Sequence, residues 1–414
     1  MSCLAADEGL GEKRMKTYLY VTPFFPKPGD WRGSYGYDFV RAVKASGRYR
    51  VEVFVEGAEA VDYEVGGIRV HEFPAKYLPS NILPFFWRRR NVKSFLAAVR
   101  RAGVDAGDVA VCHGNTANYA IYALAAKSEF PRCRSILHHH DLFSFGLRNG
   151  ILRHCWFYNL LMFTVFRRLH ERIDLHVFIS ERSRRSFLDA PDTGWTDYAL
   201  YKKQMRYLPY RPAKIKESVV LHNGVDRSLF VSDGRTAHEG FVIGCIGNFV
   251  ELKDQITLLK AVAASWSSEL ELEYGKIKVV FIGSGEKRAE CERYAKEHGI
   301  DAEFRDEVRH ECLPDYYRGL DLFVLPSFFE GFGCVYTEAW CCGTPFIACE
   351  GQGIEDVIPV EDRGKWLCRP RDPDDLAAKI TAYAKNRWEQ RLTEDCDINT
   401  LVGDFLDRLE DHEV

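Results

Sequence analysis

The chain has 414 residues, of which 46% are hydrophobic and 28% are charged, a composition typical of a soluble globular protein. This length exceeds what one ordinary core supports, so two domains are expected. No apolar run reaches the roughly 20 residues that span a bilayer, and the polar first residues lack the pattern of a secretory signal. We therefore expect a cytoplasmic protein in which residues 1–15 form a flexible tail.

The two halves of the chain carry opposite net charge. Residues 16–214 contain 31 Lys and Arg against 18 Asp and Glu, a net charge of +13. The remainder contains 25 against 42, a net charge of −17, and the two sum to the −4 of the whole chain. A basic first half suits an anionic partner such as a membrane leaflet, a lipid or a polymer. A mere difference in solubility between the halves is the alternative.

Strand and helix patterns alternate through the first half. An apolar run predicts a strand at 17–22, and a loop rich in Pro and Gly at 23–36 leads into a helix that ends near residue 45. Further strands are predicted at 51–55, 109–112, 135–137 and 175–179, and helices at 86–101, 115–126 and 151–172. Such alternation indicates a parallel sheet with helices on both faces.

The same alternation restarts after residues 189–217, which are rich in Tyr, Pro, Lys and Asp and predict a linker. Strands are predicted at 241–247, 278–283, 320–326 and 345–349, and helices at 255–264, 287–298, 334–342 and 374–386. The predicted fold class is therefore α/β, with two doubly wound, Rossmann-like domains at 16–214 and 215–388. Residues 389–414 are expected to form a helix that returns to the first domain.

The segment 320–348 carries the most specific signal. A buried strand is followed by a tight loop and by a helix that begins near Cys334. The loop residues are Glu330, Gly331, Phe332 and Gly333. Glycines at a helix N-terminus let backbone N–H groups approach a diphosphate. We expect Glu330 to bind sugar hydroxyls and Glu338, further along the helix, to bind those of a ribose. The alternative is that Glu330 caps the helix and Glu338 lies on a solvated face.

This segment resembles the signature of retaining glycosyltransferases of the GT-B fold, of the family 4 type (glycosyl transferases group 1), whose E-x7-E motif Glu330 and Glu338 match. Three further pieces are similar to that family. Residues 222–226 (HNGVD) resemble its PNGVD, residues 247–253 resemble its G-R-x-x-x-x-K loop, and residues 281–286 (FIGSGE) resemble its G-x-G turn. The resemblance is strong over about residues 218–360 and weak before them.

The resemblance implies that the first domain binds the acceptor and the second binds a UDP- or GDP-linked sugar, a co-substrate, with no further cofactor. Lys253 would neutralise the diphosphate leaving group, and Glu330 would contact the sugar. The donor-binding residues that it implies are Gly33, Gly247, Asn248, Lys253, Gly283, Val308, Glu330, Gly331, Phe332, Gly333 and Glu338. Asn248 stands where the family has an arginine, and this removes one positive charge from the expected diphosphate clamp.

The first half adds two pieces. Gly33 and Gly36 resemble the glycine-rich loop that the family places against the donor phosphates and the acceptor, although a plain turn explains them equally. The run 138–141 (HHHD) follows a predicted strand where the family has a catalytic-site histidine near the donor sugar, and His138 and His140 both remain candidates. A metal site is the alternative, but adjacent side chains of an extended strand point to opposite faces.

No metal site is expected elsewhere. The thirteen cysteines include no C-x-x-C pair, and most lie in apolar runs as reduced buried thiols do. The pairs Asp372/Asp374 and Asp395/Asp397 do not follow buried strands of a nucleotide-binding half. Helix capping and solvated surface explain them better.

We therefore expect a metal-independent, retaining transferase of the hexosyltransferase type that acts on a saccharide or lipid-linked acceptor in surface polysaccharide or glycolipid synthesis. The segment 83–90 (LPFFWRRR) favours peripheral contact with the inner membrane leaflet. No nucleic-acid partner is expected. The alternatives are a nucleotide-sugar epimerase of the same fold and a non-catalytic homologue that binds nucleotide-sugar.

Overall fold

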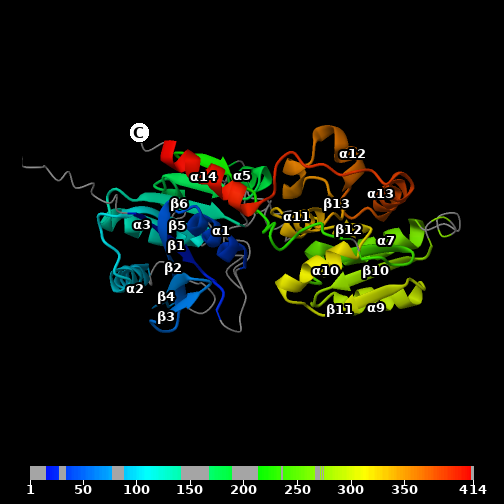
Figure 1. Ribbon diagram of the computed structural model, residues 1–414, viewed down its shortest axis with the longest axis horizontal. Coiled ribbons are helices and arrows are strands. Elements are labelled where there is room, and N and C mark those ends of the chain that lie inside the picture. The colour runs from blue at the N-terminus through cyan, green and yellow to red at the C-terminus, as the bar shows by residue number, and fades with distance from the viewer. Residues whose placement is uncertain are drawn as a thin grey trace, which may run out of the picture.

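The computed structural model describes residues 15–27, 34–76, 88–140, 167–188, 213–234, 236–265, 271, 273 and 275–411. These residues form two α/β domains that lie side by side (Figure 1). Gly33 lies outside the described residues, as do residues 83–87 of the basic aromatic segment and residues 151–166 of the third predicted helix.

The first domain is built on an eight-stranded sheet with the order β3-β4-β2-β1-β5-β6-β7-β8. Its strands are β1 (Lys16–Thr22), β2 (Tyr49–Gly57), β3 (Asp62–Val65), β4 (Ile68–Pro74), β5 (Val109–Asn115), β6 (Arg134–His139), β7 (Leu175–Phe178) and β8 (Ser218–Val220). All neighbours are parallel except the β3–β4 hairpin. β8 pairs with β7, so it lies in the first sheet although the sequence placed residues from 215 onward in the second domain.

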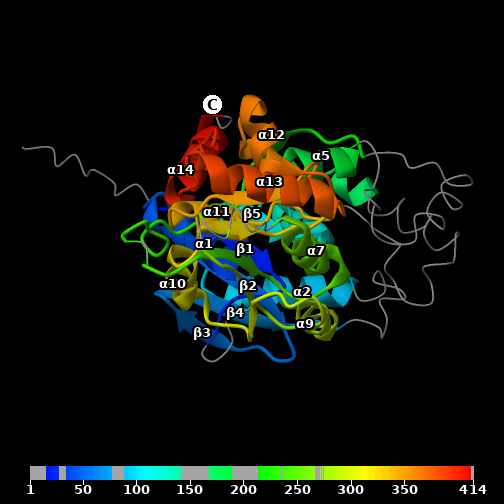
Figure 2. The same cartoon turned by 90° about the vertical axis from the view of Figure 1, so that its right-hand side faces the viewer.

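Helices cover both faces of this sheet. The helices and short helical turns of the first domain are α1 (Ser34–Ala45), α2 (Arg88–Arg101), η2 (Ala117–Tyr119), α3 (Ala120–Glu129) and α5 (Glu181–Leu188). α14 (Ile398–Asp411), at the end of the chain, packs on α1 rather than on the second domain (Figures 1 and 2). Phe405 of α14 contacts Phe39 of α1, with ring centroids 6.1 Å apart.

The second domain has six parallel strands in the order β11-β10-β9-β12-β13-β14. They are β9 (Phe241–Ile246), β10 (Ile277–Ile282), β11 (Ala302–Arg305), β12 (Leu322–Val324), β13 (Phe346–Cys349) and β14 (Leu367–Cys368). The strand order reverses between β9 and β12. In open α/β sheets the crevice at the carboxyl ends of such strands is where ligands bind.

The helices of the second domain pack in two groups. α7 (Gln255–Ser265), α9 (Arg288–Glu297) and α13 (Pro373–Asn386) pack along one another and face the viewer in Figure 2, away from the first domain. α10 (Leu313–Arg318) packs on α11 (Cys334–Cys341). The shorter elements are η4 (Glu251–Lys253), η5 (His310–Cys312), η6 (Gly353–Val357), η7 (Val360–Asp362) and α12 (Arg363–Trp366).

The chain passes between the domains twice, once after β8 and once before α14, and backbone hydrogen bonds join the two connections where they cross. Val225 N donates to Cys396 O at 2.7 Å, and Ile398 N donates to Val225 O at 3.0 Å. A Cβ on Gly224 would lie 2.5 Å from Ile398 Cα, so only glycine allows the two backbones to approach this closely. The domains are therefore linked through a defined crossing point next to the cleft.

Candidate functional site

The loop from Glu330 to Gly333 joins β12 to α11 at the carboxyl edge of the second sheet. Gly333 has φ +89°, and a Cβ there would lie 2.7 Å from the ring of Tyr336. That ring is fully buried, and its hydroxyl donates to Leu325 O at 2.7 Å, so it cannot move aside. Glycine is therefore required for the tight turn into α11.

Residues of the first domain contact this loop directly. Ser180 Oγ donates to Gly331 O at 2.7 Å. A Cβ on Gly331 would lie 2.9 Å from Ile179 Cδ1 and 3.3 Å from His140 O. From within the second domain, a Cβ on Gly353 would lie 1.8 Å from Gly331 O. Gly331 is thus enclosed at the contact between the two domains.

Lys253 reaches the loop from η4, which follows β9. Its ammonium forms an ion pair with the carboxylate of Glu330, and both side chains are mostly buried. The Gln352 side-chain oxygen accepts from Glu330 N at 2.8 Å, so the backbone of the glutamate is held as well. A cation and a carboxylate therefore meet at the point where the strand order reverses.

Gly247 and Gly283 follow the adjacent strands β9 and β10, and a Cβ on Gly247 would lie 3.9 Å from Lys253 Cε. Gly283 has φ +146°, and a Cβ on it would lie 2.3 Å from Gly247 O. Asn248 follows Gly247, and its carbonyl accepts from Gln255 Nε2 at 3.0 Å. The predicted donor-binding residues 247, 248, 253 and 283 therefore occupy one edge of the sheet together with Glu330.

Glu338 lies on α11 and is 7% exposed. Tyr317 OH donates to its carboxylate at 2.8 Å, and His310 Nε2 lies 3.1 Å from the other oxygen. Burial lowers the pKa of His310, but the hydrogen bond and charge of Glu338 outweigh burial and raise it above its ordinary value. Val308, just before η5, packs partly buried against the core of the second domain. The alternative of a solvated face for Glu338 is therefore wrong.

Asp38 on α1, which the sequence analysis did not single out, approaches Glu338 from the first domain. Burial raises the pKa of the Asp38 carboxyl to about 6; Arg41 and His310 oppose this rise, and the charges of Asp226 and Glu338 add to it. Arg41 pairs with Asp226 across the domain boundary at 2.5 Å. α1 therefore contacts the second half of the chain through the Arg41–Asp226 ion pair.

His138 and His140 lie at the end of β6, under α1. Their ring centroids are 4.0 Å apart, and Tyr35 lies 4.5 Å from His140. Burial lowers the pKa of His140 to about 3 and that of His138 well below its ordinary value, so both rings are neutral at pH 7. Of the three consecutive histidines, His140 is the one whose carbonyl meets Gly331, whereas His139 bonds to His176 within the first domain.

A small cavity of about 20 Å³ lies between the first domain and the connection that leads to the second. His138 and His140 line it from the first domain, and His222 and Asn223 line it from the connection between the domains. Among the described residues, neither ring nitrogen of His138 has a hydrogen-bonding partner, and the same holds for Nε2 of His140. The cavity therefore offers neutral imidazole groups to a polar atom.

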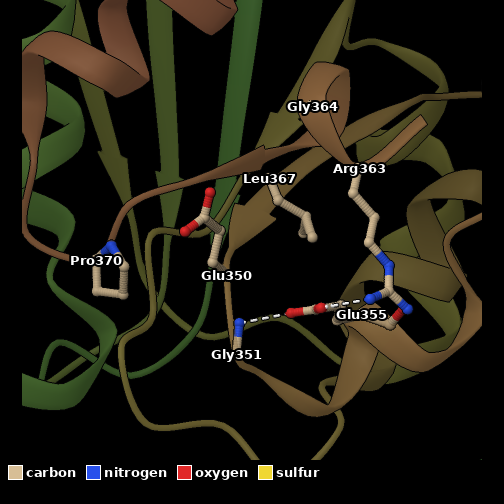
Figure 3. A pocket seen from close by; sticks show the side chains of 7 residues that line it. All are labelled: Glu350, Gly351, Glu355, Arg363, Gly364, Leu367 and Pro370. Atoms are coloured by element: carbon tan, nitrogen blue, oxygen red, sulfur yellow. Dashed lines mark hydrogen bonds and ion pairs between the residues drawn. The ribbon is translucent and has the colours of Figure 1, made fainter. Parts of the chain in front are cut away.

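A larger cavity of about 580 Å³ opens at the carboxyl ends of β13 and β14 (Figure 3). Glu355 accepts from Gly351 N at 2.6 Å through one carboxylate oxygen and from Arg363 at 2.6 Å through the other. Glu355 thus joins Gly351 to Arg363 in this cavity (Figure 3). Since Gln352 follows Gly351 and its side chain accepts from Glu330 N, the cavity borders the Glu330–Gly333 loop.

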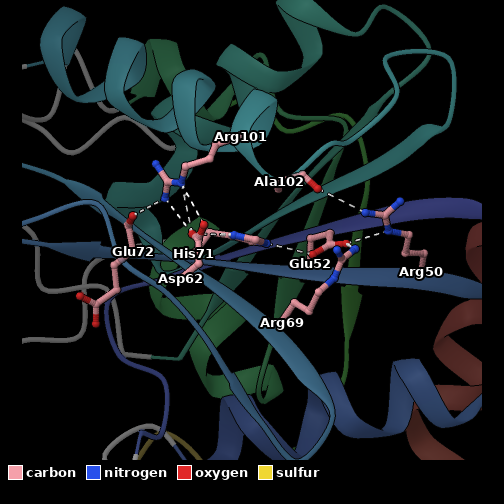
Figure 4. A network of polar contacts seen from close by, with 8 residues as sticks. All are labelled: Arg50, Glu52, Asp62, Arg69, His71, Glu72, Arg101 and Ala102. Carbon is pink, nitrogen blue, oxygen red and sulfur yellow. Dashed lines mark hydrogen bonds and ion pairs between the residues drawn. The ribbon is translucent and has the colours of Figure 1, made fainter.

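A second ionic cluster lies on the outer strands of the first sheet, away from these cavities (Figure 4). Glu52 is fully buried, and its carboxylate lies 3.0 Å from His71 Nε2. His71 Nδ1 lies 2.9 Å from Asp62, which also accepts from Arg101 at 2.9 Å. The cluster ties β2, β3, β4 and α2 together, which is a structural role.

The Asp-x-Asp pairs cap backbone turns. Asp372 accepts from Asp375 N at 3.0 Å at the start of α13, and Asp397 accepts from Asn399 N at 2.7 Å. Across the described parts of the chain, no three His, Cys, Asp or Glu side chains are grouped as metal ligands. The helices that the structure describes include none with the length and apolar character that crossing a membrane requires.

The sequence analysis did not identify the residues that contact the site but lie far from it along the chain. They are Ser180, Gln352, His310, Tyr317 and His222. Each lies at least 20 positions from the group that it contacts, so no local motif contains the pair. His222 alone carried a signal, because it stands where the resembled motif has a proline.

Two family models match the chain. One, described as "Glycosyl transferases group 1", matches residues 228–400, and the other, "Glycosyltransferase Family 4", matches residues 33–192. The chain is 33% identical over 177 residues to D-inositol 3-phosphate glycosyltransferase 1 of Catenulispora acidiphila, which covers 39% of this chain and 42% of that protein. It is 25% identical over 236 residues to sulfoquinovosyl transferase SQD2 of Arabidopsis thaliana, covering 56% and 42%. These matches span about two fifths of the relatives' own length.

Solved structures resemble the whole chain. Sucrose-phosphate synthase of Thermosynechococcus elongatus superposes with a TM-score of 0.63 at 18% identity, covering 95% of both chains. HepE of Anabaena in complex with UDP and glucose superposes with a TM-score of 0.62 at 17% identity, covering 95% of this chain and all of that one. At these identities the likeness shows the fold, and the prediction of two facing Rossmann-like domains is confirmed.

Proposed function

Because the chain belongs to the GT-B glycosyltransferases of the group 1 and family 4 type, we propose that it moves a glycosyl group from a nucleotide-diphosphate sugar to a hydroxyl of an acceptor. The observation that carries this proposal is the Lys253–Glu330 ion pair at the reversal of strand order. It is supported by the contact of the adjacent Gly331 with His140 and Ser180 of the other domain.

The donor diphosphate would bind between Lys253 and the N-terminus of α11. The ammonium supplies a full positive charge, and the first N–H groups of the helix add a partial one. A diphosphate that takes Lys253 as its partner would release the Glu330 carboxylate for the hydroxyls of the sugar. Glu338, already an acceptor for Tyr317, would accept from the ribose hydroxyls.

Bond cleavage places negative charge on the departing diphosphate, and a preorganised cation lowers the free energy of that state. The attacking hydroxyl would enter from the first domain, where the neutral rings of His138 and His140 face the cleft. Closing the domains over the donor would exclude water, which otherwise competes as the acceptor. We infer transfer with retention of anomeric configuration, as the family resemblance implies.

The acceptor is proposed to be a saccharide or a lipid-linked saccharide, made into surface polysaccharide or glycolipid at the inner face of a membrane. The net charge of +13 on residues 16–214 supports an anionic partner for the first half. A relative named sulfoquinovosyl transferase and others named D-inositol 3-phosphate glycosyltransferases are compatible with a polar acceptor.

The proposal is tested by offering UDP-, GDP- and ADP-linked sugars to the purified protein and measuring thermal stabilisation and release of nucleotide diphosphate. A true donor raises the apparent stability because it binds the folded state. We expect release to accelerate when a saccharide or lipid-linked acceptor is added. Conversion of the nucleotide-sugar to its epimer without any acceptor would show an epimerase, and binding without turnover would show a non-catalytic homologue.

A further inference from the structure

His222 lies directly behind the donor loop. It follows β8 in the connection that leads to the second domain, and its ring stacks on the ring of Phe332, with centroids 5.0 Å apart and planes inclined by 22°. Phe332 is 1% exposed, and the His222 side chain is 13% exposed. The contact therefore joins the connection to the middle of the Glu330–Gly333 loop.

Both ring nitrogens of His222 face carboxylates. Nδ1 lies 2.6 Å from Glu394, and Nε2 lies 3.3 Å from Asp356. A carboxylate accepts hydrogen bonds, so this arrangement requires a proton on each nitrogen, which is the imidazolium form. Burial lowers the pKa of His222, but the two carboxylates outweigh burial and raise it to about 9.

The two carboxylates come from different parts of the molecule. Asp356 lies on η6 of the second domain and also accepts from Glu181 N of the first domain at 2.6 Å. Glu394 lies on the returning connection, close to Cys396, whose carbonyl accepts from Val225 N. Among the described residues, the other titratable side chains that line the small cavity with His222 are Tyr20, Tyr35, His138 and His140. Burial keeps both histidines neutral and raises the pKa of Tyr20. His222 is therefore the point where both domains and both connections meet the donor loop.

We propose that His222 is a positioning residue of the donor site, whose imidazolium holds Phe332 and thereby fixes the backbone N–H groups of the loop against the donor diphosphate. An imidazolium stacked on an aromatic ring adds a cation–π attraction that a proline at this position lacks. The contact between His222 and Phe332 also ties the loop to the crossing point, so the loop keeps a fixed position relative to the domain interface. This inference rests on the proposed donor site and adds a residue to it.

The test compares wild type with His222→Gln, which removes the charge and keeps a polar side chain, and with His222→Pro, the residue of the resembled motif. His298→Gln is the control, because His298 is an exposed histidine of the second domain, at the end of α9. The probe is whichever of UDP, GDP and ADP stabilises wild type most, and its nucleoside serves as a second probe. Dissociation constants are measured at pH 7 and pH 9.5.

We expect His222→Gln and His222→Pro to weaken diphosphate binding about threefold to tenfold at pH 7 and to leave nucleoside binding unchanged. Between pH 7 and pH 9.5 the diphosphate affinity of wild type should fall by a similar factor more than that of His222→Gln. Lysine titration affects both proteins alike, so the comparison with the variant cancels its contribution. Any of three results would overturn the inference. Both variants could bind the diphosphate as wild type does, diphosphate and nucleoside binding could weaken equally, or variant and wild type could respond to pH alike. If the variants do not fold, the wild-type response decides: affinity equal at the two pH values overturns the inference. Should wild type bind none of the three diphosphates, the proposed function itself fails.

Discussion

Lys253 and Glu330 form an ion pair across the point where the strand order of the second sheet reverses, one from the loop after β9 and the other from the loop after β12. The two side chains are 77 positions apart in the chain. Under the proposed function, this contact joins the cation that meets the leaving group to the carboxylate that meets the sugar.

Replacing Lys253 by alanine should weaken binding of the nucleoside diphosphate. A hydrogen bond to a charged group contributes about 1.5–3 kcal/mol, which corresponds to about a tenfold to hundredfold loss of affinity. Calorimetric titration with the preferred diphosphate measures it. Lys260→Ala, on the exposed side of α7, is the control and should bind as wild type does. Unchanged affinity in Lys253→Ala would remove Lys253 from the donor site.

Gly333→Ala should both destabilise the protein and reduce transfer. The turn holds residue 333 at φ +89°, where a residue with a Cβ is strained by about 1–2 kcal/mol, and the added Cβ also meets the buried ring of Tyr336 at 2.7 Å. Gly299→Ala is a matched control, since Gly299 has φ +64° with nothing within 4 Å of an added Cβ. Urea unfolding should show a larger loss for Gly333→Ala than for Gly299→Ala. Equal losses would mean that the Tyr336 contact relaxes freely.

Stability should fall in mild acid because several buried histidines are neutral. Burial lowers the pKa of His176 to about 3, whereas the unfolded chain takes up a proton near pH 6.5. The unfolded state therefore binds more protons below pH 6.5, and each such histidine costs the folded state about 1.4 kcal/mol per pH unit down to its folded pKa. Urea midpoints at pH 7.5 and pH 5 measure the fall.

His176→Gln should reduce this acid sensitivity, because glutamine replaces a donor and an acceptor without titrating. His298→Gln, at an exposed site, should leave it unchanged. A pH dependence identical in His176→Gln and wild type would assign the acid sensitivity to other groups.

Glu52→Leu should destabilise the first domain without affecting the donor site. The cost should be about 1–3 kcal/mol, because buried His71 loses its acceptor, whereas Arg50 and Arg69 are partly exposed and can turn to water. Denaturant unfolding measures the loss, and diphosphate affinity in the native protein is the control. Weakened affinity alongside the lost stability would place the cluster in the binding mechanism rather than in the fold alone.

The sequence predicted the elements whose conformation is determined by neighbouring residues in the chain. The strand–loop–helix at 320–342 follows from a buried apolar run, glycines and a helical pattern, and β12, the loop and α11 lie there. The β3–β4 hairpin was not predicted, because its first strand alternates exposed and half-buried residues over only four positions. Its turn is marked only by Gly66 and Gly67, both with positive φ.

The supporting residues of the site could not be predicted, because tertiary packing brings them in. Ser180 reaches Gly331 across 151 positions, and His222 reaches Glu394 across 172. Likewise, nothing local in 138–140 distinguishes the three histidines. Only the contact of the His140 carbonyl with Gly331 separates His140 from its neighbours.

The most direct test of the donor site is to measure transfer and nucleotide binding together in Glu330→Ala. In the proposed site Glu330 contacts the sugar and Lys253 contacts the diphosphate, so the substitution should lower the rate of transfer about a hundredfold or more. The dissociation constant of the nucleoside diphosphate should change by less than about threefold, since one charge-assisted contact to the diphosphate is retained. Transfer at the wild-type rate in Glu330→Ala would contradict the account.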